Sequence, residues 1–318
     1  MESKTTNIKL PKSAIDFLDY CRDIRELSEG TIVGYENDLK IFIMFLKSLK
    51  NKNDRHAIND KYIKTIELKQ LYGFMTYLKN DRGVKNNSAT TRSRKVATLK
   101  AYFNYLQNKA KLITYNPAYE LESPEIPDKK PIVLNVEQSK KLITSLDKNS
   151  KLYKRDYCIL TLFLQCGIRL SELCNIKLVN IKDNIITIFG KGSKERYVYL
   201  NVSCVKAINE YLEVRKVEGV NEENLQYLFL SERKQKININ TVQVLVKSHL
   251  KEADLTDKKY STHKLRGSYA TMMSRAGANI NQISKNLGHK SIKTTQRYIC
   301  VDEQELKILA EINPLNNL

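Results

Sequence analysis

The sequence predicts a mainly α-helical protein with a small β-sheet, divided into two domains. Apolar residues recur at three- and four-residue spacing along most of the chain, a pattern typical of amphipathic helices. Two β-rich runs, residues 185–189 and 195–200, flank a glycine-containing segment and predict a hairpin. Four of the six prolines fall within fifteen residues, where the repeated loss of amide donors excludes a helix: Pro117, Pro124, Pro127 and Pro131.

The proline-rich segment predicts the boundary between the domains. We expect a helical domain over residues 1–118, a linker over residues 119–133 and an α+β domain over residues 134–318. Apolar periodicity in the first domain predicts a bundle of four helices, around residues 14–18, 35–46, 68–78 and 96–106. We expect Ser28 or Thr31 to cap the second of these helices, and Ser88 or Thr90 to cap the fourth.

The second domain combines helices with the hairpin. Its apolar patterns predict helices over Val136–Leu146, Tyr157–Gln165, Leu170–Ile176, Val202–Arg215, Thr241–Ala253, His263–Arg275 and Ile280–Asn286. No apolar run approaches the ~18 residues needed to span a bilayer, so we expect no membrane contact and a cytoplasmic location. Cysteines at 158, 166 and 174 recur within apolar helical patterns, which predicts buried thiols; we expect neither a metal site nor a disulfide framework.

Charge indicates the class of partner. The chain holds 54 basic and 35 acidic residues, a formal net charge of +19, and this excess favours a polyanion such as DNA. Residues 1–130 carry 24 basic and 16 acidic side chains, so the excess extends over both domains. Charge alone leaves open a second interpretation, in which lysines only solubilise the surface.

One segment of the first domain is basic throughout. Residues 82–111 contain eight basic residues and no acidic one. Hydroxyl, amide and guanidinium groups gather where the fourth helix begins, next to the positive end of its dipole, and this suits a phosphate. We expect DNA contacts here, the alternative being an ordinary solvated helix face; the candidate residues are Arg92, Arg94, Lys95 and Lys100.

A second set of polar residues is not explained by helical patterning. Each has an ordinary structural interpretation when taken alone, as a surface arginine, a hairpin lysine or a capping histidine. Together they supply what is needed to cleave a phosphodiester without a metal or a cofactor, in a chain with only four histidines. The set is Arg169, Lys191, His263, Arg266, His289 and Tyr298.

The chemistry explains why these residue types are needed. A phenol with an ordinary pKa near ~10 is a weak nucleophile at neutral pH and requires a proton acceptor, a role that suits His263. Attack on phosphorus builds charge on the non-bridging oxygens, which the guanidinium groups of Arg169 and Arg266 can stabilise. The departing 5′ oxygen requires a proton, which we expect from Lys191, with Lys194 as the alternative.

Four segments carry a family resemblance. They are Gly167-Ile-Arg-Leu-Ser-Glu-Leu173, Gly190-Lys-Gly-Ser-Lys-Glu-Arg196, His263-Lys-Leu-Arg266 and Leu287-Gly-His-Lys-Ser-Ile-Lys-Thr-Thr-Gln-Arg-Tyr298. In order and spacing they resemble the successive motifs of tyrosine recombinases, the phage-integrase and Xer-type family. The chain departs from this pattern at Gly267, where the family often has a histidine, and at Ile299-Cys300, where it often has Thr-His. We expect these departures to affect only local packing.

The resemblance implies a clamp around double-stranded DNA, formed by a SAM-like core-binding domain and a catalytic domain. It implies that Tyr298 forms a 3′-phosphotyrosyl link, that a freed 5′ hydroxyl then attacks this link, and that exchange proceeds through a Holliday junction without ATP. Four protomers would act on paired recombination sites, as a homotetramer or with a second recombinase. A C-terminal helix over residues 301–312 would dock on the neighbouring protomer.

Two other functions are compatible with parts of the pattern. A non-catalytic DNA-binding regulator would explain the charge but not the spacing of the four motifs. A type IB topoisomerase would share the chemistry without strand exchange. Within the recombinase interpretation, the sequence leaves open chromosome-dimer resolution, element integration or excision, and inversion, as well as the target DNA sequence.

Overall fold

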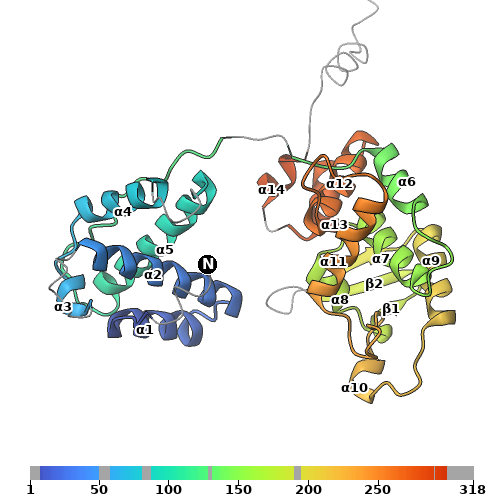
Figure 1. Cartoon of the computed structure of the whole chain (residues 1–318), viewed down its shortest axis with the longest axis horizontal. Coiled ribbons are helices and arrows are strands. Elements are labelled where there is room, and N and C mark those ends of the chain that lie inside the picture. Colours follow the sequence, from blue (N-terminus) through green and yellow to red (C-terminus); the bar gives the residue numbers. More distant parts are fainter. Residues whose placement is uncertain are drawn as a thin grey trace, which may run out of the picture. The chain divides into compact units, whose positions relative to one another are not determined.

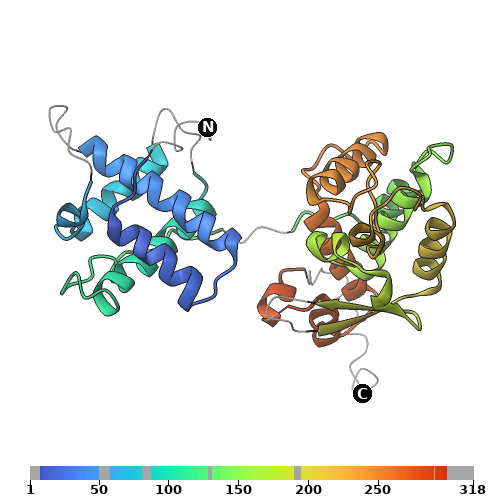
Figure 2. The same cartoon turned by 90° about the horizontal axis from the view of Figure 1, so that it is seen from below.

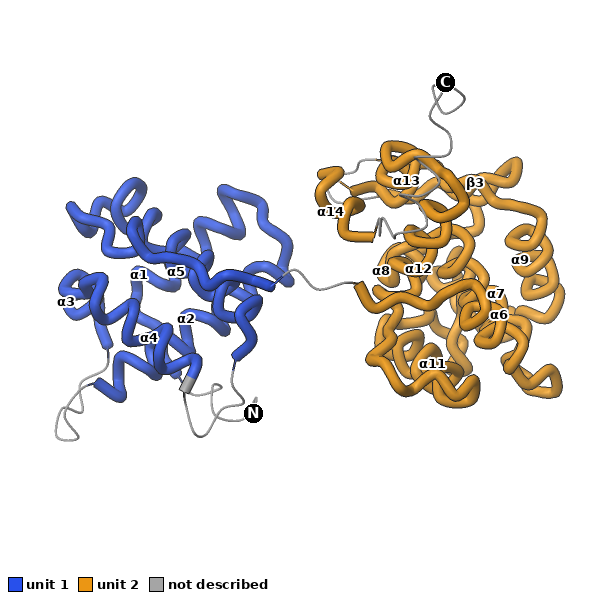
Figure 3. The backbone as a smooth tube through the Cα atoms, turned by 90° about the horizontal axis from the view of Figure 1, so that it is seen from above, with its two compact units in different colours: residues 1–128 blue, residues 129–318 orange. Residues whose placement is uncertain are grey.

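The computed structural model describes residues 8–49, 58–80, 87–127, 131–189, 195–289 and 291–298. The chain forms two compact units, residues 1–128 and residues 129–318 (Figure 3). Each unit has a hydrophobic core of its own, and the two sets of buried residues do not overlap. In the described part of the chain, no helix combines the length and the apolar character needed to cross a bilayer.

The regular elements of unit 1 are all helices over its described residues (Figure 1). The four expected helices are present, and a short one, α3, is additional. A π-helical turn at Tyr20–Ile24 extends the first helix. The bounds are α1 Lys12–Asp19, α2 Glu29–Leu49, α3 Asp60–Ile63, α4 Leu68–Asn80 and α5 Ala89–Asn108.

Aromatic side chains fill the interior of unit 1. Phe42 of α2 lies edge-on to Phe74 of α4, with ring centroids 5.1 Å apart. Tyr102 of α5 is fully buried, and its hydroxyl lies 2.7 Å from the Ser13 hydroxyl of α1. The N-terminus of α5 is capped by Ser88, whose hydroxyl accepts from the Thr91 amide at 3.2 Å, as one of the two predicted caps. These contacts hold α1, α2, α4 and α5 together as the predicted bundle.

Unit 2 combines helices with a three-stranded sheet, so the mainly helical fold with a small sheet is confirmed. The predicted helices match α6 Val136–Thr144, α7 Tyr153–Cys166, α8 Leu170–Cys174, α9 Val202–Val214, α11 Ile239–Glu252, α12 Thr262–Arg275 and α13 Ile280–Leu287. Four short elements were not predicted: a 3₁₀ turn at Leu178–Asn180, β1 Ile181–Lys182, α10 Glu222–Leu225 and α14 Ile292–Gln296. Each is too short to show an apolar period.

The predicted hairpin strands are β2 Ile185–Phe189 and β3 Glu195–Tyr199, which pair antiparallel with Ile186 opposite Val198. Inward side chains such as Ile188 are buried, whereas Tyr197 and Tyr199 on the other face are exposed. The strand β3 lies beside α13 (Figure 2). Residues 190–194, between β2 and β3, lie outside the described residues.

Helix α7 runs through the core of unit 2 and packs against α9 and α12. Its buried residues occupy every side of the helix, which explains why its apolar run is nearly continuous. The cysteines at 158, 166 and 174 are buried free thiols, as predicted, and Cys166 Sγ lies 3.5 Å from Cys204 Sγ of α9. Because α7 is anchored on both sides, the turn that follows its C-terminus is held against the core.

Candidate active site

The site begins at the turn between α7 and α8. Gly167 ends α7 with φ 62°, a left-handed conformation that suits glycine. A Cβ at this position would lie 2.5 Å from Cδ1 of Tyr269, so the residue must also be small. The chain then reverses, and Arg169 becomes the N-cap residue of α8. Arg169 is one of the six residues that the sequence predicted for the site.

Arg266 of α12 binds the backbone of the same turn. Its side chain is buried, and its two terminal nitrogens donate to the Gly167 carbonyl, at 2.6 Å, and to the Leu287 carbonyl. Burial, with the neighbouring cation of Arg169, lowers the pKa of Arg266 to about 9. The group remains a cation at neutral pH. It therefore joins the ends of α7 and α13 and places a positive charge between them.

Arg169 is held by a carboxylate and a carbonyl. Its Nη1 donates to Glu172 Oε1 at 2.7 Å, and its Nη2 donates to the Gly288 carbonyl at 2.6 Å. Glu172 also accepts from the Arg169 amide at 2.8 Å, which caps α8. The Arg169 side chain keeps 38% of its surface exposed, so the guanidinium remains open to a ligand.

Arg196 of β3 completes this arrangement and was not predicted. Its Nη1 and Nη2 donate to the two oxygens of Glu172 at 2.7 and 2.8 Å, and its Nε donates to the Asn286 carbonyl at 2.9 Å. Burial raises the pKa of Glu172, but hydrogen bonds and charge from Arg196 and Arg169 outweigh it, so the net pKa is lowered. One carboxylate is thus shared by two arginines. The only sequence signal for Arg196 was its place at the end of the Gly190-to-Arg196 motif.

His289, like Arg169, comes shortly after a helix that ends at a glycine. Gly288 ends α13 with φ 62°, and the next residue is His289. Its Nδ1 lies 2.8 Å from the hydroxyl of Thr295, a fully buried residue of α14. Burial, with the cations Arg266 and Arg169, lowers the pKa of His289 to about 4. The imidazole is therefore neutral at physiological pH.

Tyr298 lies just after α14 and points its hydroxyl at α12. The Tyr298 hydroxyl oxygen lies 3.3 Å from His263 Nε2. Desolvation, with the charges of Arg266 and Arg169, lowers the pKa of His263, although the residue keeps solvent-exposed surface. A neutral imidazole at this distance can accept the phenolic proton.

The charges of this cluster favour an anion. Two guanidinium groups, those of Arg169 and Arg196, pair with the carboxylate of Glu172, and Arg266 adds a third cation nearby. Burial and these cations together disfavour protonation of both histidines. A phosphate would relieve this repulsion. Within the described residues, no group of three or more His, Cys, Asp and Glu side chains is arranged to hold a metal ion.

Five of the six predicted residues therefore meet in unit 2: Arg169, His263, Arg266, His289 and Tyr298. The sixth, Lys191, and its alternative Lys194 lie outside the described residues, between the ends of β2 and β3. The predicted C-terminal helix at 301–312 also lies outside them.

The basic segment of unit 1 differs from the prediction at one position. Lys95 was expected to face DNA, but its side chain is 4% exposed and its Nζ donates to Asp38 Oδ1 of α2 at 2.7 Å. Arg94 pairs with the same carboxylate, Nη2 to Oδ1 at 2.7 Å, while its side chain stays 52% exposed. Lys100 is exposed. Lys95 therefore stabilises the interior of the bundle, because a buried carboxylate requires a counter-charge.

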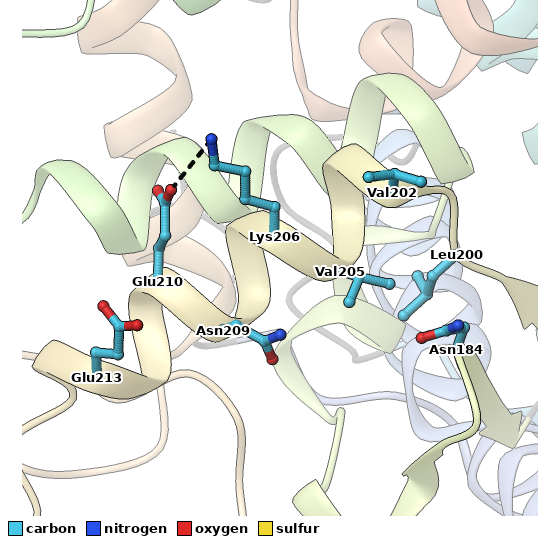
Figure 4. A pocket seen from close by; sticks show the side chains of 8 residues that line it. All are labelled: Asn184, Leu200, Val202, Val205, Lys206, Asn209, Glu210 and Glu213. Atoms are coloured by element: carbon cyan, nitrogen blue, oxygen red, sulfur yellow. Dashed lines mark ion pairs between the residues drawn. The ribbon is translucent and has the colours of Figure 1, made fainter.

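A separate hollow of about 450 Å³ lies along α9 (Figure 4). Val202 and Val205 form part of its wall, and Lys206 and Glu210 make an ion pair at 3.8 Å on its rim. Among the predicted site residues that the structure describes, none lines it. The hollow is therefore separate from the cluster of arginines and histidines described above.

Comparison with known proteins agrees with this geometry. Residues 133–305 match the phage integrase family, and residues 14–110 match the phage integrase N-terminal SAM-like domain. The tyrosine recombinase XerC of Caldanaerobacter subterraneus is 44% identical over 97% of this chain and 88% of its own length. The tyrosine recombinase XerD of Listeria monocytogenes is 29% identical over 92% of this chain and 95% of its own length.

Solved structures share the fold. The Tn1549 transposon integrase, in complex with a circular intermediate DNA, has a TM-score of 0.72 at 18% identity and covers 95% of this chain and 99% of its own. The XerH recombinase, bound to a palindromic difH substrate, has a TM-score of 0.70 at 21% identity and covers 94% of this chain and 84% of its own. The chain belongs to the phage integrase family and is a site-specific tyrosine recombinase of the Xer type. The topoisomerase and regulator alternatives are not favoured.

Proposed function

We propose that this enzyme cleaves DNA by attack of the Tyr298 phenol on the scissile phosphorus. A bond forms between the phenolic oxygen and phosphorus, and the bond to the 5′ oxygen breaks. The product is a 3′-phosphotyrosyl link and a free 5′ hydroxyl. The observation that carries this proposal is the 3.3 Å approach of the Tyr298 hydroxyl to His263 Nε2, on the helix that also holds Arg266.

His263 accepts the phenolic proton, which its lowered pKa permits at neutral pH. Arg169 is more exposed than Arg266. Its N–H groups that are not bonded to Glu172 or to the Gly288 carbonyl donate to the non-bridging oxygens. Arg266 is buried against the turn at Gly167, and its positive charge stabilises the negative charge that develops on the phosphate. His289, neutral and held through Nδ1, offers Nε2 to a phosphate oxygen.

The leaving 5′ oxygen takes its proton from Lys191, with Lys194 as the alternative donor. The phosphotyrosyl link retains the phosphodiester bond, so the 5′ hydroxyl of a partner strand can attack it and reform DNA without ATP or another cofactor. Glu172 and Arg196 hold Arg169 in place and do not touch the substrate in this scheme.

The partner is double-stranded DNA with paired recombination sites. Support comes from structural neighbours, which include a lambda integrase dimer bound to a core site (TM-score 0.63, 17% identity) as well as the DNA complexes above. Four protomers act on two sites, alone or with a second recombinase, and a Holliday junction is the intermediate. In unit 1, Arg92, Arg94 and Lys100 contact phosphates. We place the enzyme in the cytoplasm with its DNA.

A nicked suicide substrate tests the nucleophile. With the cognate site, the unmodified enzyme should accumulate a covalent complex, because the short strand diffuses away after cleavage. Tyr298→Phe should bind the same DNA normally and form no complex, since it lacks the attacking oxygen. Covalent complex in this variant would remove Tyr298 from the mechanism. If the cognate site is not yet known, it can be obtained by sequencing DNA trapped covalently on the protein in its own cells.

A further inference from the structure

Gly267 has no backbone reason to be glycine. It lies in the interior of α12 and its φ is not positive. Glycine weakens a helix interior relative to alanine, so a glycine here requires another explanation. A Cβ at Gly267 would lie 2.7 Å from Cε1 and 3.3 Å from Cδ1 of Tyr298, and 3.3 Å from Cγ1 of Val133. The closest of these neighbours is the ring of Tyr298.

Two further contacts with Tyr298 come from the same stripe of α12. His263, Gly267 and Thr271 are four residues apart and therefore share one face of the helix. His263 Nε2 lies 3.3 Å from the Tyr298 hydroxyl, and the Thr271 hydroxyl donates to the Tyr298 carbonyl at 3.1 Å. The stripe thus contacts Tyr298 at its hydroxyl, along its ring and at its backbone.

We propose that Gly267 and Thr271 are positioning residues for Tyr298, and that with His263 they form a cradle on α12 that sets the direction of nucleophilic attack. The proposal rests on the function proposed above for Tyr298. Thr271 anchors the backbone of Tyr298, and the space at Gly267 admits the ring against the helix. The hydroxyl then meets His263 rather than sampling other rotamers, which lowers the orientational cost of the attack.

If Gly267 had only a structural role, the effect of enlarging it would not depend on Tyr298. Gly267 also lies near Val133, so it could be small only to let the chain before α6 approach α12. In that case a larger residue would destabilise the protein whether or not the Tyr298 ring is present. The proposal instead requires the effect to depend on that ring.

Gly267→Ala tests the effect on chemistry. Displacing the Tyr298 ring should slow covalent complex formation on the suicide substrate by about 100-fold, the typical result of a misplacement of about 1 Å. The dissociation constant for DNA should not change. Gly30→Ala is the matched control, because Gly30 also lies in a helix, α2, and a Cβ there meets nothing within 4 Å. Complex formation by Gly267→Ala within about twofold of the unmodified rate would overturn the proposal.

A double-mutant cycle measured by Tm tests whether the Tyr298 ring causes the effect of Gly267→Ala, and it does not require activity. Gly267→Ala should lower Tm when Tyr298 is present. In a Tyr298→Ala background the same change should lower Tm much less or not at all, since the closest contact is gone and the gain in helix propensity offsets the remaining 3.3 Å approach to Val133. An equal loss of Tm in both backgrounds would assign Gly267 to the Val133 contact and overturn the proposal. The Tm measurements still test the contact between Gly267 and the Tyr298 ring if Tyr298→Phe shows that Tyr298 is not the nucleophile.

Thr271 provides the second variant pair. Thr271→Val removes the donor to the Tyr298 carbonyl at nearly constant volume and should slow complex formation by about tenfold, with DNA binding unchanged. Thr271→Ser keeps the hydroxyl and should restore a rate near that of the unmodified enzyme. Equal rates for the Val and Ser variants would overturn the role of Thr271.

Discussion

His263 and His289 lie where the protonated imidazole is disfavoured. Burial lowers the pKa of both side chains, and the neighbouring cations Arg266 and Arg169 lower it further. His249 of α11 is the opposite case. Burial lowers its pKa, but hydrogen bonds to Asp156 and Glu252 outweigh this and raise it. The same residue type is thus neutral in the site and more readily protonated outside it.

A histidine titration by NMR should separate these residues in the DNA-free protein. We expect His289 to titrate near pH 4 and His263 below pH 6.5, because burial and then the cationic neighbours disfavour the protonated form. His249 should titrate above 6.5. Single His→Gln variants assign the resonances. If the His263 resonance titrates above that of His249, His263 is not held as a neutral proton acceptor.

The leaving-group donor can be identified with a 5′-bridging sulfur at the scissile position. A thiolate leaves without a proton, so Lys191→Ala should cut a normal phosphodiester poorly but the sulfur substrate nearly as fast as the unmodified enzyme does. Arg169→Ala should gain no such rescue, because phosphorane charge develops with either leaving atom. Rescue of Lys194→Ala alone would assign the role to Lys194, and rescue of neither would place the general acid elsewhere.

At the scale of elements, α5 differs from the helix expected at its position. The sequence predicted a helix with a basic face for DNA, yet that helix also binds α2 through a buried carboxylate. Asp38 accepts from Arg94, Lys95 and the Thr98 hydroxyl, the last at 2.9 Å. The contact joins residues 56 to 60 positions apart, which no local pattern predicts. Arg94 and Lys95 of the basic segment therefore help to hold α5 against α2.

Asp38→Ala should destabilise unit 1 by about 3–5 kcal/mol, because it leaves the Lys95 ammonium buried without a counter-charge. Urea unfolding of the full chain measures the change. Adding Lys95→Met should recover much of the loss, since it removes the uncompensated charge. Arg94→Ala is the matched control and should cost less, because the Arg94 side chain is half exposed. An Asp38→Ala variant as stable as the unmodified protein would contradict a structural role for this cluster.

At the scale of the whole molecule, the two units have separate cores. Calorimetry should therefore resolve two unfolding transitions, one for each unit. Asp38→Ala should lower the midpoint of one transition and leave the other in place. Leu160→Ala, which opens a cavity in the core of unit 2, should have the converse effect. A single transition that moves as a whole in both variants would show that the units unfold cooperatively.

The sequence by itself determined the features that depend on near neighbours. Apolar periodicity predicted the long helices and the two paired strands, and the proline-rich segment marked the boundary between the domains. Motif spacing selected Arg169, His263, Arg266, His289 and Tyr298. These signals are local, because side chains three or four residues apart meet on one helix face whatever the rest of the fold does.

Only the tertiary structure decided which distant groups meet. It joined Arg196 to Glu172 across 24 positions and Arg169 to the Gly288 carbonyl across 119, and it buried Lys95 against Asp38. Gly267 was expected to alter only local packing, yet its closest neighbour is the ring of Tyr298, 31 residues further along the chain. Such contacts depend on how whole elements pack, because burial forces each polar group to find a partner wherever the fold supplies one.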